Sequence, residues 1–123
     1  MSWAGLAGRK LIFLETRGRR TGKPHSVELW FAVQDDKIYL SHEGRYTDWM
    51  KNLQKYNKVN FRIADTCLSG IARIVAEKEG FSKGKYALYA KYYGKASDDV
   101  IDDWFSESTV VEISSVAQEK RNN

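Results

Sequence analysis

The sequence has few of the residues that staple or interrupt small proteins: one cysteine, one proline and two histidines in 123 residues. The lone Cys67 cannot form an internal disulfide, which is typical of proteins in a reducing compartment. Two histidines and one cysteine without clustered spacing predict no metal site. Pro24 stands alone and no linker rich in serine or glycine divides the chain, so we expect residues 1–123 to form one domain.

Long hydrophobic runs are also missing from the sequence. No stretch approaches the roughly 20 consecutive apolar residues that a membrane helix needs, which predicts no membrane span. Arg9 and Lys10 interrupt the N-terminal segment before an apolar signal-peptide region develops, so we expect no secretory signal. Together with the single cysteine, these absences predict a cytoplasmic protein.

The charge is moderately positive, with 20 Lys and Arg against 16 Asp and Glu and a net charge of +4. Such a balance suits an anionic ligand, although it would also suit nucleic acid. The sequence has no recognisable nucleic-acid-binding motif, so nucleic acid is not an expected partner. The placement of the charge is more informative, because residues 17–23 hold four cations and no anion.

Short apolar runs alternate with turn residues along the chain, which predicts strands more than helices. Tight reversals, such as the one expected at Asp35 and Asp36, join neighbouring strands and make them antiparallel. The absence of a strand–helix–strand rhythm argues against a dinucleotide-binding fold. We therefore predict a mainly β protein with peripheral helices: a six-stranded antiparallel barrel, closed or split, with strands over 10–16, 25–34, 37–41, 58–64, 67–78 and 109–116, and helices over 47–56, 83–93 and 97–105.

The turn over residues 17–23 is the most informative segment. Its two glycines allow a sharp bend that brings backbone N–H groups to a ligand. Arg19 and Arg20 offer forked donors for phosphate or carboxylate, and Thr21 adds a hydroxyl. The alternative interpretation is a solvated basic hairpin loop. A phosphate-binding loop of the nucleotide-hydrolase type is excluded, because Pro24 stands where its helix should begin.

A second group of candidates follows the predicted strands. Ser41 ends a predicted strand and His42 begins the loop that follows, a position where side chains often hold ligand groups. His42 is also a candidate general acid near neutral pH. Trp30 lies on the opposite strand face from Leu29 and Phe31, where it could line an aromatic cofactor site or pack the second face of the sheet.

The predicted helices carry two further expectations. Asn52 is the polar residue on a helix face that otherwise buries Trp49 and Leu53, so we expect it to hydrogen-bond a neighbouring strand. Four tyrosines on the helix predicted over 83–93 either pack against the barrel or roof a pocket: Tyr86, Tyr89, Tyr92 and Tyr93.

Read together, several segments resemble a known family. Residues 16–22, T-R-G-R-R-T-G, resemble the T-x-G-R-[KR]-[ST]-G turn of the deazaflavin-dependent nitroreductases, relatives of the pyridoxamine-phosphate-oxidase-like split barrels. Further landmarks follow in the family's order over about residues 10–117: Leu29-Trp30-Phe31, Ser41 with Gly44, Trp49-x-x-Asn52-Leu53, and Asn57-x-Val59.

The resemblance implies an FMN-binding-like split β-barrel that acts as a deazaflavin-dependent oxidoreductase. The terminal position and basic residues of 118–123 separately predict a flexible tail. The resemblance also implies that coenzyme F-420, a 5-deazaflavin, exchanges hydride with a small organic acceptor of the nitro or quinone kind. By this resemblance Arg19, Arg20 and Thr21 meet the phosphate and glutamate tail of the coenzyme. Ser41 and His42 contact its ring or phosphate, and Trp30 lies beside the ring.

Alternatives remain open at this point. His42 stands where relatives often have lysine, and the proline that usually precedes the helix tryptophan is absent. FMN is therefore the alternative cofactor, and a cofactor-binding protein without turnover is the alternative function. Split-barrel relatives commonly pair, and the chain has four tryptophans and seven tyrosines. We therefore expect a homodimer held by barrel faces.

Overall fold

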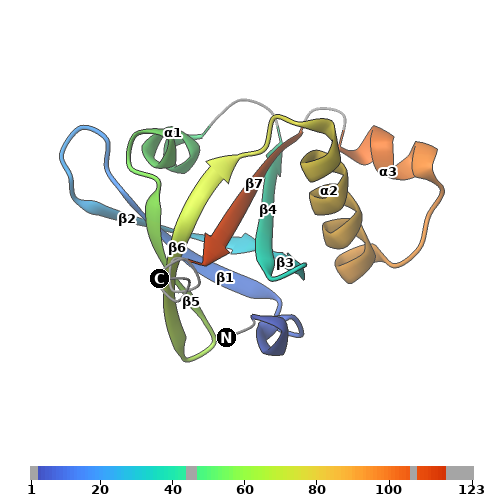
Figure 1. The fold of residues 1–123 in the computed structure, drawn as a ribbon, viewed down its shortest axis with the longest axis horizontal. Helices are drawn as coiled ribbons and strands as arrows, with labels where there is room; N and C mark the ends of the chain where they lie inside the picture. The colour runs from blue at the N-terminus through green and yellow to red at the C-terminus, as the bar shows by residue number, and fades with distance from the viewer. Residues whose placement is uncertain (1–2, 44–46, 106–107, 116–123) are drawn as a thin grey trace, which may run out of the picture.

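The computed structural model describes residues 3–43, 47–105 and 108–115. Seven strands form one antiparallel sheet in the order β2-β1-β5-β6-β7-β4-β3 (Figure 1). Their bounds are β1 Leu11–Arg17, β2 Pro24–Trp30, β3 Ala32–Gln34, β4 Lys37–Glu43, β5 Lys58–Ile63, β6 Thr66–Ile74 and β7 Ser108–Ser115. The mainly β antiparallel fold predicted from the sequence is confirmed. The tail over 118–123 lies outside the described residues.

Helices lie at two ends of the sheet. The α1 helix (Asp48–Lys55) packs on β1 and β6, near the turn that joins β1 to β2 (Figure 1). At the other end, α2 (Lys78–Tyr93) packs on β3, β4 and β7, with α3 (Asp98–Trp104) beside it. A short 3-10 helix, η1 (Ala4–Leu6), contacts β3. In the described part of the chain, no helix is both long and apolar enough to span a membrane.

The barrel is split, and the strand count is seven rather than the predicted six. The single strand expected over 25–34 breaks at Phe31: β2 pairs with β1, while β3 pairs with β4. The break has a physical cause, because Phe31 is bonded to α2 instead of to a strand. Its N–H donates to the Tyr92 hydroxyl at 3.0 Å, and its carbonyl accepts from Lys91 Nζ at 2.8 Å. The segment thus joins both edges of the sheet, and no ladder links β2 to β4.

The α2 helix begins earlier than the sequence predicts, and the strand before it ends earlier. The predicted strand over 67–78 stops at Ile74, and the helix starts at Lys78 rather than at residue 83. Gly80 and Gly84 lower the helix propensity of this region. In the structure Gly84 is where the helix approaches the sheet, since an added Cβ would lie 2.6 Å from Val110 Cγ1.

Other local predictions are confirmed. Asp35 and Asp36 form the tight reversal between β3 and β4, with φ angles of 53° and 61°. All three helices exist near their predicted positions. The core has two parts, one enclosed by the barrel and one between α2, α3 and the outer face of β4 and β7.

Candidate functional site

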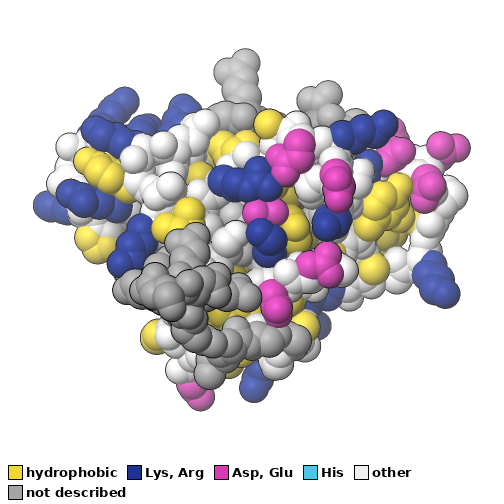
Figure 2. All heavy atoms as spheres, viewed as in Figure 1, with side chains coloured by type: hydrophobic (Ala, Val, Ile, Leu, Met, Phe, Trp, Pro, Cys, Tyr) yellow, Lys and Arg dark blue, Asp and Glu magenta, His cyan; other side chains and the backbone are white. Residues whose placement is uncertain are grey.

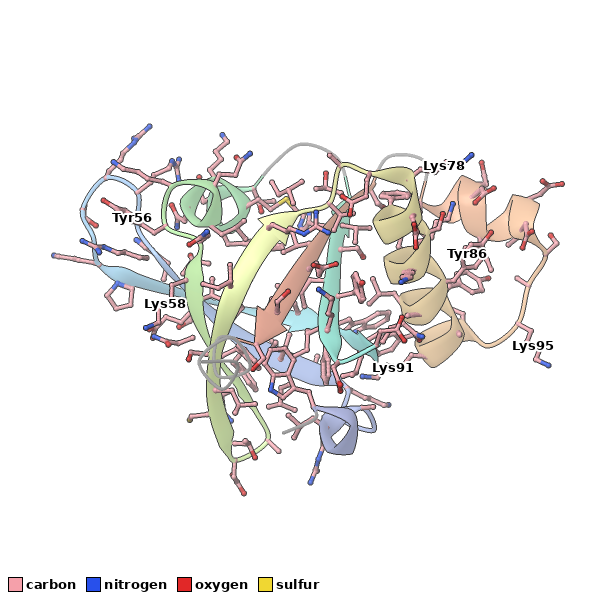
Figure 3. The ribbon with its side chains drawn as sticks, viewed as in Figure 1. Tyr56, Lys58, Lys78, Tyr86, Lys91 and Lys95 are labelled. Atoms are coloured by element: carbon pink, nitrogen blue, oxygen red, sulfur yellow. The ribbon has the colours of Figure 1, made fainter. Side chains whose placement is uncertain are left out.

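Positive charge gathers at the end of the molecule that carries the β1–β2 turn and α1 (Figure 2). We call this the basic end and define it by seven residues: Arg17, Arg19, Arg20, Lys23, Lys51, Lys55 and Lys58. Figure 3 shows Tyr56 and Lys58 beside this turn. A cavity of about 590 Å³ opens here between the turn, the start of β2 and the first turns of α1. We call it the turn pocket.

The backbone of the turn is closely fixed. The Gly18 N–H donates to the Lys23 carbonyl at 2.7 Å, and the Gly22 N–H donates to the Gly18 carbonyl at 2.9 Å. Gly22 has a φ of 75°, which favours glycine. A Cβ on Gly18 would lie 2.8 Å from His25 Nε2 and 3.0 Å from the Lys23 carbonyl oxygen, so a larger residue would force His25 to move. The turn therefore presents Arg20 and Thr21 at its exposed tip.

The two arginines of the turn differ in their surroundings. The Arg19 guanidinium donates to Asn52 Oδ1 at 2.9 Å and forms an ion pair with Asp48 at 3.2 Å. Arg20 lines the same pocket, is exposed, and makes no ion pair or side-chain hydrogen bond with any described residue. The expectation that Asn52 bonds a strand is confirmed, because its Nδ2 donates to Thr16 Oγ1 of β1 at 3.1 Å.

Thr47, which sequence reasoning missed as a site residue, also lines the turn pocket. It is the N-cap of α1, yet its hydroxyl makes no capping bond and is buried without a partner among the described residues. A buried hydroxyl without a partner is unfavourable by about 1–3 kcal/mol. The start of α1 also leaves N–H groups that favour negative charge. An anionic ligand oxygen in this pocket would satisfy both.

A second cavity, of about 350 Å³, lies between β2, β4, α2 and α3. We call it the aromatic pocket. It brings together Trp30, Ser41 and His42 from the sequence prediction and adds residues that the sequence did not single out as one site: Leu88, Tyr89, Tyr92, Tyr93, Phe105 and Ser108. The Trp30 ring stacks on Tyr92, with ring centroids 4.4 Å apart and planes 12° apart. Trp30 also contacts the Tyr93 ring, at 6.0 Å between centroids, and it remains 49% exposed, so part of its ring is accessible to a ligand.

Three of the four tyrosines of α2 line the aromatic pocket, and the fourth faces α3 rather than the barrel (Figure 3). Tyr89, Tyr92 and Tyr93 line the aromatic pocket, whereas Tyr86 lies on the side of α2 that faces α3 (Figure 3). Burial raises the pKa of Tyr92, so its hydroxyl stays protonated at neutral pH. Burial also lowers the pKa of Lys91, next to Tyr92 on α2, to about 8. These two groups hold Phe31 and so fix the bend that carries Trp30.

The two pockets share strand β2. Ser26 lines the turn pocket and Trp30 lines the aromatic pocket, four residues further along the strand and on the same strand face, which corresponds to about 13 Å. One elongated ligand can therefore place an anionic group in the first pocket and a planar ring in the second. A larger cavity, of about 910 Å³, is a groove on β1, β5 and β6 that contains none of the predicted site residues. The described residues hold no group of three or more metal-ligating side chains.

Comparisons with known proteins agree with this fold. The family model for F420H(2)-dependent quinone reductases matches residues 3–99. A conserved hypothetical protein from Mycobacterium tuberculosis is 25% identical, with a TM-score of 0.78, over 94% of this chain and 81% of that one. No curated protein matches the sequence.

Two further solved structures share the fold at low identity. A pyridoxamine 5'-phosphate oxidase candidate from Listeria innocua is 12% identical, with a TM-score of 0.61, over 88% of this chain and 85% of that one. A structure described as an F420-H2 dependent reductase is 16% identical, with a TM-score of 0.62, over 86% of this chain and 95% of that one. The fold is therefore the split barrel of the pyridoxamine-phosphate-oxidase type.

Proposed function

Because the chain belongs to the F420H(2)-dependent quinone reductase family, we propose that it transfers hydride between coenzyme F-420 and a small organic acceptor such as a quinone or a nitro compound. One observation carries this proposal: a pocket lined by two arginines and a pocket lined by aromatic rings both include residues of β2. A deazaflavin coenzyme with a phosphorylated tail needs both.

The turn pocket fits the phosphate and tail. The Arg20 guanidinium is exposed and has no partner among the described residues, so it is available to a phosphate or carboxylate. The buried Thr47 hydroxyl has no hydrogen-bond partner among the residues that the structure describes, and a phosphate oxygen would provide one. Arg19, Arg20 and Thr21 are the residues we propose for this end, with Thr47 added by the structure.

The aromatic pocket fits the ring. Trp30 is half exposed and stacks on Tyr92, and Ser41 and His42 line the same pocket, where they are our candidates to donate hydrogen bonds to ring oxygens. When bound, the coenzyme supplies the hydride chemistry. The protein's own residues orient the ring, exclude water with the tyrosines of α2, and hold a proton at His42 for the reduced acceptor.

The direct test is a fluorescence titration with coenzyme F-420 and, separately, with FMN. We expect tighter binding of the deazaflavin, followed by oxidation of its reduced form when a quinone is added. Arg20→Gln should weaken binding of the coenzyme, whereas Lys95→Gln should not, because Lys95 is exposed in the α2–α3 connection (Figure 3). Tighter binding of FMN, or equal losses for both variants, would contradict the proposal.

We also propose that the protein works as a homodimer in the cytoplasm. The groove on β1, β5 and β6 offers an apolar strip around Phe13 and Leu68 for pairing of barrel faces. Light scattering at micromolar concentration should return twice the mass of one chain. A mass of one chain would show that the barrel acts alone.

A further inference from the structure

Residue 19 is held by α1 at three separate groups. Its backbone N–H donates to Asn52 Oδ1 at 3.1 Å, and its carbonyl accepts from Lys55 Nζ at 3.0 Å. Its guanidinium reaches Asn52 and Asp48. Positions 48, 52 and 55 share one face of a helix, so that face bonds both the backbone and the side chain of Arg19 in the basic turn.

Asn52 is the centre of this contact. It is only 3% exposed, and its Nδ2 donates at 3.1 Å to the hydroxyl of Thr16, which is fully buried. The amide therefore ties together the end of β1, the turn and α1. Hydrophobic packing of the helix does not require an amide here, because Trp49, Met50 and Leu53 already bury apolar surface. The polar contact itself is what Asn52 adds.

Arg19 and Arg20 differ in whether their charge is paired within the described part of the protein. Arg19 is 25% exposed and its charge is offset by Asp48. Arg20 lines the same pocket with its charge unpaired among the described residues. A phosphate in the pocket therefore meets the available guanidinium of Arg20 and that of Arg19, which is already bonded to α1.

We infer that Arg19 and Asn52 are positioning residues that hold the basic turn against α1, and that Arg20 is the arginine that contacts the anionic ligand. This inference rests on the proposed function in that it concerns the same pocket. It differs from the interpretation in which both arginines bind the ligand directly.

The experiment is a double-mutant cycle of Arg19→Gln and Arg20→Gln, titrated with inorganic pyrophosphate and with coenzyme F-420 at several salt concentrations. We expect Arg20→Gln to weaken binding about tenfold or more and to flatten its salt dependence, because a direct ionic contact is lost. Arg19→Gln should weaken binding less and leave the salt dependence steep. Its effect should fall below about twofold in the Arg20→Gln background, because positioning matters only while Arg20 is present.

A second measurement tests, without any ligand, the contact by which Asn52 holds the turn against α1; we call this contact the clamp. Asn52→Leu removes the amide at similar volume, and hydrogen exchange of residues 18–22 should accelerate at least tenfold while exchange in β5 and β6 stays unchanged. The matched control is Gln54→Leu, an exposed position on the same helix. If Asn52→Leu does not fold, the arginine cycle still decides the question.

Two results would overturn the inference. In the first, the fold-losses in affinity of the two single variants multiply in the double variant, and each single variant has a flatter salt dependence. This would show that Arg19 is itself a ligand-binding group. Unchanged exchange at residues 18–22 in Asn52→Leu would show that no clamp exists. If the protein binds pyrophosphate with this pattern but not coenzyme F-420, the positioning role stands and the proposed function fails. If it binds neither, the assignment of Arg20 as the contacting arginine also fails.

Discussion

The turn pocket and the aromatic pocket lie on the same strand but are built by different physical means. The first is formed by a backbone turn, a helix start and charged side chains. The second is formed by stacked rings from β2 and α2, held by the bend at Phe31. We therefore expect ligand binding in the turn pocket to depend on the charge of the ligand and on salt concentration. Ligand binding in the aromatic pocket should depend on the shape of the ring and on the packing of the surrounding side chains.

The largest expected effect comes from a change in helix packing that should alter the aromatic pocket and leave the turn pocket intact. In Gly84→Ala the new Cβ meets Val110 and Tyr39, at 2.6 and 3.0 Å, so α2 must move away from the sheet. We expect a loss of about 2 kcal/mol in the free energy of unfolding, measured by urea denaturation. Binding of coenzyme F-420 should weaken while pyrophosphate binding stays unchanged. Gly8→Ala is the control, because no atom lies within 4 Å of its added Cβ.

Removing the open ring should affect only the second pocket. Trp30→Ala should weaken binding of coenzyme F-420 by about 2 kcal/mol, or roughly 30-fold, because stacking on one ring face is lost. The loss should be the same at low and high salt, since no charge is removed. Fluorescence titration at two ionic strengths measures both. A loss confined to low salt would mean that Trp30 acts through the basic end.

Thr47→Val should change the stability of the protein and the affinity of the turn pocket in opposite directions. The substitution removes a buried hydroxyl that has no partner and makes no capping bond. We expect the free protein to gain about 0.5–1 kcal/mol of stability, while pyrophosphate binds about fivefold more weakly. Thermal unfolding and calorimetric titration check the two signs. A destabilised protein with unchanged binding would show that Thr47 serves the helix rather than a ligand.

The smallest effect concerns pH. Burial lowers the pKa of Lys91 to about 8 in the folded protein, below its value in the unfolded chain, which is about 10.4. The unfolded state then binds more protons between these values, so this group adds stability as pH rises from about 8 to 10. Lys91 is partly exposed, so we expect a gain below about 1 kcal/mol. The rise should disappear in Lys91→Met, measured by denaturation at pH 7 and pH 9.5.

Local patterns explain which features the sequence could predict. Strand alternation, the reversal at Asp35 and Asp36, and the polar Asn52 on an apolar helix face are all properties of neighbouring residues. The family resemblance is confirmed by the match over residues 3–99.

Contacts distant in the sequence account for the rest. The break at Phe31 depends on Tyr92, 61 residues away, and the clamp on Arg19 depends on Asn52, 33 residues away. Gly84 weakens a helix in isolation, yet it is needed where α2 touches the sheet. Neither spacing nor propensity reveals such pairs. The unpaired Thr47 hydroxyl, likewise, is visible only once the pocket around it exists.

The central claim is that one elongated coenzyme occupies both pockets along β2. Amide chemical shifts of the labelled protein, followed by NMR during titration with coenzyme F-420, test it most directly. The account predicts that residues 18–21 and 47 at the turn pocket and residues 30, 41 and 42 at the aromatic pocket shift together with one affinity. Shifts confined to one pocket, or centred on the groove of β1, β5 and β6, would contradict it.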